Sequence, residues 1–230
     1  MPVKPEKPKQ LSFLHGGPRT PGPGKKLGRP PGRRPWVPRV SRPSVSRHTP
    51  LHVTLRARDG TNLRDFPCRM SLQEALRRAR GRLGLEGIHY SILKNHLHLV
   101  VEAADKRALA RGMQGLQIRM ARGVNKNLGA RGKLFVDRYH VRALRTPREV
   151  RNTLAYVLNN CRKHEAERSR VLRSMWLDPC SSATYFDGWK ERKADAVDDE
   201  APVVPPSTWL LRVGWRRHGP IPIDEIPGSS

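Results

Sequence analysis

Between residues 48 and 165, the apolar positions follow the spacing of strands and helices in turn. Four short runs of β-branched or alternating apolar residues predict strands, at 52–56, 87–94, 96–102 and 135–144. Because a single residue separates the second run from the third, we expect them to form a hairpin that turns at Lys94–Asn95.

Three longer stretches repeat apolar residues every three or four positions, which is the period of a helix that buries one face. They span 71–83, 105–127 and 146–165. The first opens with the capping box Ser71-x-x-Glu74, and the last opens with a second box from Thr146 to Glu149. In such a box each side chain satisfies a free backbone N–H, so both boxes predict helix starts.

The resulting order, β-α-β-β-α-β-α, predicts an α+β fold, namely a ferredoxin-like β-α-β-β-α-β sandwich with one additional C-terminal helix. Its sheet has two faces, and two helices cover only one of them. We therefore expect the other face to be open for function.

The distribution of charge divides the chain into three parts. Residues 1–47 hold 12 Lys and Arg, one acidic residue and 11 prolines, a composition that predicts a disordered basic arm. Residues 48–165 carry most of the basic excess and nearly all of the periodicity. Residues 166–230 are expected to form a C-terminal extension, with a linker at 195–206 and a small apolar segment at 209–215.

The whole chain has 45 Lys and Arg against 20 Asp and Glu, a formal net charge of +25. Such a charge favours a polyanionic partner, and nucleic acid is the leading candidate. No apolar run approaches the ~18 residues that cross a bilayer, and no secretory signal is recognised at the start. Three scattered cysteines do not make a disulfide framework, so we expect a protein of the reducing cytoplasm, without a membrane.

Candidate chemistry begins with the strand that contains His96 and His98. Strand alternation places these two imidazoles and Val100 on one face, and Leu97 and Leu99 on the other. Since the leucines belong in the core, both imidazoles lie on the open face, close enough to share one ion. The alternative is a solvated or locally hydrogen-bonded pair of histidines.

The last predicted helix carries a tyrosine away from its apolar stripe. Tyr156 and Asn160 are one turn apart on the same helix face, and His164 continues that column. A phenol that lies beside an amide oxygen and near two imidazoles can take part in a reaction, whereas a tyrosine in the core only fills space. Two alternatives are a surface tyrosine and a structural zinc site formed by Cys161 and His164 with the two strand histidines.

The residues around these two sites resemble those of a known protein family. The stretch Ile92–Glu102 resembles the His-hydrophobic-His strand of the HUH single-tyrosine transposases, closest to the REP-associated tyrosine transposases. The strand 52–56, the segment 132–139 and the helix at 156–160 agree with that family in order and spacing. The resemblance covers residues 48–164.

The resemblance implies that Tyr156 is a nucleophile attacking a phosphodiester of single-stranded DNA, with a 5′-phosphotyrosyl intermediate. It implies that His96, His98 and Asn160 are ligands of a divalent metal. Two imidazoles, an amide oxygen and water suit Mg²⁺ or Mn²⁺, and the imidazoles favour Mn²⁺. The implied partner is a DNA single strand bearing hairpins, bound by a monomer or homodimer in a bacterial, nucleoid-associated setting.

Three basic residues flank the tyrosine on its helix, Arg148, Arg151 and Lys163, and they are candidates for binding phosphates or are solvated charges. Two functions are consistent with these features. The first is a transposase-like DNA strand transferase, which we favour because the tyrosine, both histidines and the asparagine are all present. The second is a catalytically silent, host-retained protein that binds DNA hairpins.

Overall fold

The computed structural model describes residues 44–82 and 84–228, in which four strands pair into one antiparallel sheet in the order β2-β3-β1-β4. The strands are β1 Leu51–Arg56, β2 Leu85–Ile92, β3 His96–Ala103 and β4 His140–Ala143. Helices and strands follow one another in the order β1-α1-β2-β3-α2-β4-α3. The predicted α+β class is confirmed.

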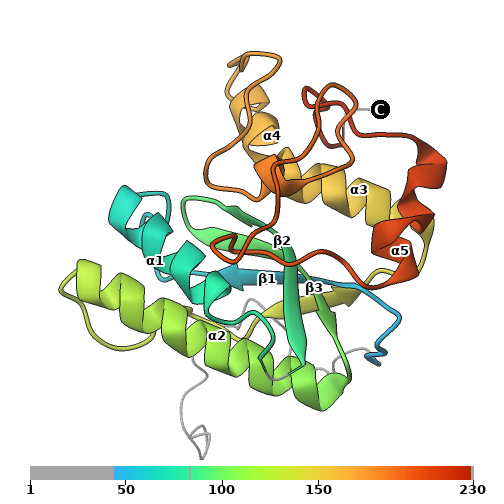
Figure 1. Ribbon diagram of the computed structural model, residues 1–230. Coiled ribbons are helices and arrows are strands. Elements are labelled where there is room, and N and C mark those ends of the chain that lie inside the picture. Colours follow the sequence, from blue (N-terminus) through green and yellow to red (C-terminus); the bar gives the residue numbers. More distant parts are fainter. Residues whose placement is uncertain (1–43, 83, 229–230) are drawn as a thin grey trace, which may run out of the picture. The chain divides into compact units, whose positions relative to one another are not determined.

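Two helices, α1 (Phe66–Arg77) and α2 (Lys106–Asn127), cover one face of the sheet (Figure 1). Their apolar stripes pack with Leu97, Leu99 and Val101 of β3 in one hydrophobic cluster. The predicted alternation along this strand is therefore correct, and it turns the histidines of β3 to the opposite face.

The second face is not left open, because α3 (Pro147–Leu158) crosses it. The apolar stripe of α3 packs on Val100 of β3 in a second cluster, together with Phe186 and Trp215 from the C-terminal part of the chain. Phe186 directly follows a short 3₁₀ helix at Ala183–Tyr185, and Trp215 lies in a second one at Gly214–His218. The prediction of an open face is thus wrong over the part that α3 covers, since the amphipathic helix needs an apolar surface to pack on.

Several predicted boundaries shift. Helix α1 begins at Phe66, after Asp65, and not at Ser71. The predicted capping box at Ser71 and Glu74 does not form, because Ser71 lies inside the helix and is not its N-cap. The carboxylate of Glu74 binds Arg77 and Arg78 instead. The helix ends at Arg77, and the final predicted residue of its stripe lies outside the described residues.

The tyrosine helix is also shorter than predicted. The capping box at its start does form, with the Thr146 hydroxyl accepting from Glu149 N at 3.2 Å. However, Asn159 departs from helical geometry, with φ −102° and ψ 16°, and a separate helix α4 spans Asn160–Ala166. The strand predicted at 135–144 likewise shrinks to β4, and Phe135 makes only an isolated bridge to Ala57.

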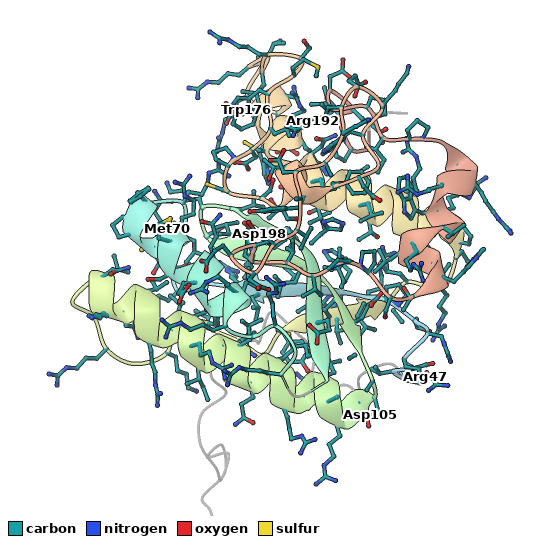
Figure 2. All side chains as sticks on the ribbon, viewed as in Figure 1. Arg47, Met70, Asp105, Trp176, Arg192 and Asp198 are labelled. Carbon is teal, nitrogen blue, oxygen red and sulfur yellow. The ribbon has the colours of Figure 1, made fainter. Side chains whose placement is uncertain are left out.

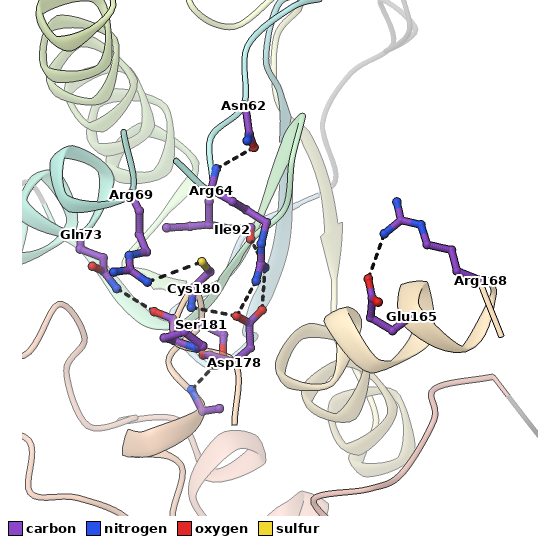
Figure 3. Close-up of polar contacts among 12 residues, drawn as sticks. Asn62, Arg64, Arg69, Gln73, Ile92, Glu165, Arg168, Asp178, Cys180 and Ser181 are labelled. Atoms are coloured by element: carbon purple, nitrogen blue, oxygen red, sulfur yellow. Dashed lines mark hydrogen bonds and ion pairs between the residues drawn. The ribbon is translucent and has the colours of Figure 1, made fainter. Parts of the chain in front are cut away.

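A partly buried ion pair holds the C-terminal part of the chain against the sheet (Figure 3). Both terminal nitrogens of Arg64 donate to the carboxylate of Asp178, each at 2.8 Å. Arg64 also donates to the carbonyl of Ile92 at 3.0 Å, and Asp178 accepts from Cys180 N at 2.9 Å. A bidentate pair with further hydrogen bonds on both sides sets orientation as well as proximity.

A second anchor involves Glu102 at the end of β3. Its carboxylate accepts from the backbone N–H groups of Ser207 and Thr208, which precede α5 (Trp209–Arg212). Before them, Ala201 and Val203 are buried in the first cluster. The segment 195–206, predicted as a linker, therefore packs on the domain along part of its length.

The predicted basic arm, residues 1–47, lies outside the described residues as far as residue 43. Within residues 44–82 and 84–228, none of the helices combines the length and the apolar content that crossing a membrane requires.

One buried histidine in this packing makes stability depend on pH. His89 lies against the ring of Phe186, with Nδ1 3.2 Å from the Ser182 hydroxyl, and burial lowers its pKa to about 3. The unfolded chain therefore binds one more proton below pH 6.5, and stability is lost as the pH falls from 6.5 towards 3. Between pH 7.5 and pH 5, His89 should remove about 2 kcal/mol of the free energy of unfolding.

Urea unfolding of the His89→Gln variant at both pH values checks this expectation. The variant should lose about 2 kcal/mol less than the parent on acidification. The exposed His218 serves as the control, and His218→Gln should leave the difference unchanged. Equal acid sensitivity in the His89 variant and the parent would contradict the assignment.

Candidate functional site

The two histidines of β3 meet the tyrosine of α3 above the sheet. Their imidazoles lie nearly perpendicular, with ring centroids 4.9 Å apart. The hydroxyl of Tyr156 lies 3.5 Å from Nε2 of His98, and the two rings contact edge to face at 5.1 Å. The structure therefore brings together His96, His98 and Tyr156, as the sequence predicts.

A third histidine, which the sequence reasoning did not assign to the site, lies directly beside His98. His52 of β1 places Nε2 3.1 Å from Nδ1 of His98, and the Thr54 hydroxyl lies 3.2 Å from the same nitrogen. The antiparallel register sets Thr54 directly opposite His98. Alternation along 52–56 was the available signal, because it puts His52, Thr54 and Arg56 on one face.

The second strand histidine is oriented by its neighbour in the turn. Nδ1 of His96 lies 2.7 Å from Oδ1 of Asn95, an oxygen that can only accept, so Nδ1 carries the proton. Nε2 of His96 therefore keeps its lone pair. In His98, a proton on Nδ1 that is donated to His52 or Thr54 leaves Nε2 with its lone pair in the same way.

Burial keeps these imidazoles neutral. It lowers the pKa of His98 to about 2, and the neighbouring His52 and His96 act in the same direction. The pKa of His52 falls to about 4 through burial, with Arg142 and His140 adding to the effect. The pKa of His96 is also lowered, first by burial. Neutral imidazoles are the form that binds metals.

These groups line a cavity of about 850 Å³ on the β1, β3 and β4 side of α3. Its basic lining residues include Arg56 at the end of β1 and Arg142 on β4. Arg142 donates to the hydroxyl of Thr153 at 3.1 Å, which ties β4 to α3. His140 is exposed and also lines the cavity. The arginines give the cavity a positive wall that suits a phosphate.

Asn160, the predicted third ligand, is not among the residues that line this cavity. It is fully buried at the start of α4, after the break at Asn159. Within the described residues, neither its amide oxygen nor its amide nitrogen has a hydrogen-bond partner. Buried polar side chains are nearly always hydrogen-bonded, so this amide is unusual and has an unused acceptor.

The three basic residues predicted to flank the tyrosine have different environments, and Lys163 lies on α4. Arg148 is exposed near the start of α3. Arg151 makes a bidentate pair with Glu225, both distances being 2.7 Å, so it binds the C-terminal segment. Lys163 places its amine 5.5 Å from the ring centroid of Tyr156. Of the three, only Lys163 contacts the predicted nucleophile.

The alternative zinc site does not form. Among the described residues, no three His, Cys, Asp or Glu side chains are grouped to hold a metal ion. Burial raises the pKa of the Cys161 thiol to about 11, with Asp178 adding to the effect. His164 pairs with Glu167 at 2.9 Å.

All four tyrosines lie within the described residues, and Tyr156 is the one that lines the cavity. Tyr90 is buried in the first cluster and accepts from Gln73 at 2.9 Å. Ile88, two residues earlier on the same strand, lies in the second cluster, because a register shift between Gly87 and His89 reverses the alternation.

Comparison with known proteins finds similarity among solved structures only. No family model matches the sequence, and no curated protein matches it. Among solved structures, the chain is similar to a REP-associated tyrosine transposase bound to a REP hairpin, with 14% sequence identity and a TM-score of 0.46. The likeness covers 64% of this chain and 82% of that one.

Proposed function

We propose that this protein is a DNA strand transferase that cleaves and rejoins single-stranded, hairpin-bearing DNA through Tyr156. The observation that carries the proposal is the phenol 3.5 Å from a buried neutral imidazole, in a cavity walled by arginines. The family resemblance of the strand at His96–His98 and of the tyrosine helix supports the same chemistry.

In the proposed reaction, the phenolic oxygen of Tyr156 attacks a backbone phosphorus. A bond forms between that oxygen and phosphorus, and the bond from phosphorus to the 3′ oxygen breaks. Overall, one proton passes from the phenol to the departing oxygen, so the products are a 5′-phosphotyrosyl link and a free 3′-OH. Attack by another 3′-OH reverses the step and joins strands without ATP, since one phosphodiester replaces another.

The cavity residues have separate roles in this proposal. Arg56 and Arg142 bind the phosphates on either side of the scissile bond, because a guanidinium matches a phosphate in charge and shape. The contact between Arg142 and Thr153 holds that arginine beside α3, which also carries the nucleophile. Packing of α3 on the second cluster keeps the phenol in place for in-line attack.

A divalent cation, Mg²⁺ or Mn²⁺, fits the donor groups of this site. His96 and His98 line the cavity and are neutral with Nε2 lone pairs available. Asn160 does not line the cavity, and we propose it as the third ligand because its buried amide oxygen has no hydrogen-bond partner among the described residues. Such a cation would polarise the scissile phosphate and stabilise its developing charge. His52 would affect the cation indirectly, because its hydrogen bond fixes the ring orientation and the tautomer of His98.

Two architectural proposals accompany this function. The order of the elements and the strand order β2-β3-β1-β4 support a ferredoxin-like sandwich with an added tyrosine helix. We also propose that residues 48–165 form the catalytic domain, with 166–230 as an extension that braces α3.

The nucleophile is tested by replacing its hydroxyl. Tyr156→Phe should lower covalent adduct formation with labelled single-stranded DNA by about 1,000-fold or more in the presence of Mn²⁺, because the attacking atom is gone. Tyr185→Phe, away from the cavity, is the matched control and should form normal adduct. Gel separation of denatured samples measures both, and an adduct from the Tyr156 variant would refute the assignment.

The strand histidines are tested by comparing cleavage with binding. His96→Ala and His98→Ala should each reduce cleavage by more than about 100-fold while DNA affinity stays within a few-fold, since charge supplies most of the binding. Asn160→Ala should be milder, because water can replace one neutral oxygen ligand. The exposed His48→Ala is the control. Parallel loss of DNA affinity in both histidine variants would show that the imidazoles are only structural.

His52 is tested as a positioning residue. His52→Leu removes the nearer of the two hydrogen-bond partners of His98 Nδ1 and should weaken Mn²⁺ binding by about 10–100-fold. His52→Gln keeps a polar group near that nitrogen and should recover most of the affinity. Calorimetric titration of Mn²⁺ into the full chain measures the effect without any turnover. Unchanged Mn²⁺ affinity in the leucine variant would disprove the role.

A further inference from the structure

The outer side of α2 carries a row of cations that the cavity does not use. Five basic residues fall within about 120° of the helix circumference at ~100° per residue, Arg107, Arg111, Arg119, Arg122 and Lys126. The buried stripe that includes Leu109 and Met120 lies opposite them. Between Arg107 and Lys126 the row extends about 28 Å at ~1.5 Å per residue.

This basic row has no acidic counterpart on its own helix. The span Lys106–Asn127 contains no Asp or Glu, and its single nearby carboxylate, Asp105, caps the helix by accepting from Ala108 N. Within the described residues, none of the five side chains makes an ion pair or a side-chain hydrogen bond. Figure 2 shows nitrogen-ended side chains that project from α2 away from the sheet.

The row also lies on the other side of the sheet from the cavity. Helix α2 packs in the first cluster with Leu97 and Leu99, whereas the cavity is lined by His96 and His98 from the opposite face of the same strand. A nucleic-acid strand held in the cavity therefore leaves the basic row free. Whatever binds the row is bound independently of Tyr156.

We propose that the basic row of α2 binds the phosphate backbone of double-stranded DNA, without reading its sequence. Unpaired cations along a straight helix match the regular line of charge on a duplex, about one per 1.7 Å of its axis. Sites for single strands add aromatic side chains on which bases stack, and α2 contains none. A membrane surface is disfavoured, because the apolar face of α2 is already buried in the first cluster.

The inference goes beyond the proposed function, because it gives the chain a second DNA contact that needs neither metal nor nucleophile. A strand transferase with two such surfaces can hold the single strand under attack and a neighbouring duplex at the same time. Duplex binding is measured in EDTA, so its result does not depend on whether Tyr156 is a nucleophile.

The test neutralises four exposed residues of the row in the full chain, Arg107, Arg111, Arg122 and Lys126, each to Gln. The matched control neutralises four exposed cations elsewhere, Arg173, Lys190, Lys193 and Arg212, again each to Gln. Both variants lower the net charge by the same amount. Glutamine is a good helix former, so α2 should persist, and circular dichroism checks that it does.

Affinity for a 30-base-pair duplex of mixed sequence is measured at several salt concentrations. The α2 variant should bind about 10–100-fold more weakly, and its salt slope should fall by about 2–4, close to one per lost phosphate contact. The control variant should keep most of the affinity and the slope. A second α2 variant with the three arginines changed to Lys should also bind well, since it keeps the charge.

Two outcomes would overturn the proposal. If the α2 variant and the control lose the same affinity, only net charge matters and α2 is not a surface for DNA. If the α2 variant binds duplex like the parent with an unchanged salt slope, the row serves another partner, such as an acidic protein. Loss confined to single-stranded DNA in the α2 variant would equally contradict a duplex site.

Discussion

The candidate site depends on the antiparallel register between β1 and β3. That register sets Thr54 opposite His98 and brings His52 within hydrogen-bond distance of the same imidazole. A slip of one residue would turn the histidines of β3 into the first cluster and its leucines towards the cavity. Burial of Leu97 and Leu99 beneath α1 and α2 prevents that slip, so the core packing and the chemistry are set by the same pairing.

The other half of the site comes from α3, whose position depends on the C-terminal part of the chain. Its apolar stripe packs on the second cluster, which residues 166–230 complete with Phe186 and Trp215. The pair between Arg151 and Glu225 ties the same helix to that segment. The extension is thus part of the support that holds Tyr156 above the sheet.

Electrostatics follow from this packing in two ways. Inside, burial keeps His52 and His98 neutral, which preserves their lone pairs in a strongly basic protein. Outside, five basic side chains that make no ion pair within the described residues lie on the exposed side of α2, and Arg56 and Arg142 line the cavity. The sheet therefore separates the cavity, with its two arginines, from the exposed basic row of α2.

The spacing of residues close together in the chain was sufficient to predict much of the fold. The α+β class, the hairpin that turns at Lys94–Asn95, the long helix α2 and the capping box at Thr146 all depend on neighbours close in the chain. Alternation along β3 also predicted which face its histidines occupy, because only one register places its leucines in the first cluster.

Tertiary contacts decided the rest. The sequence predicted a continuous helix through Asn160, but the chain leaves helical geometry at Asn159, whose side chain donates to the carbonyl of Pro222. Arg151 was a candidate for DNA, yet a glutamate far along the chain binds it. His52 escaped notice because its role depends on a partner 46 residues away. Periodicity reports which side of an element is buried, whereas the partner of a polar side chain is chosen by segments that meet only in the folded protein.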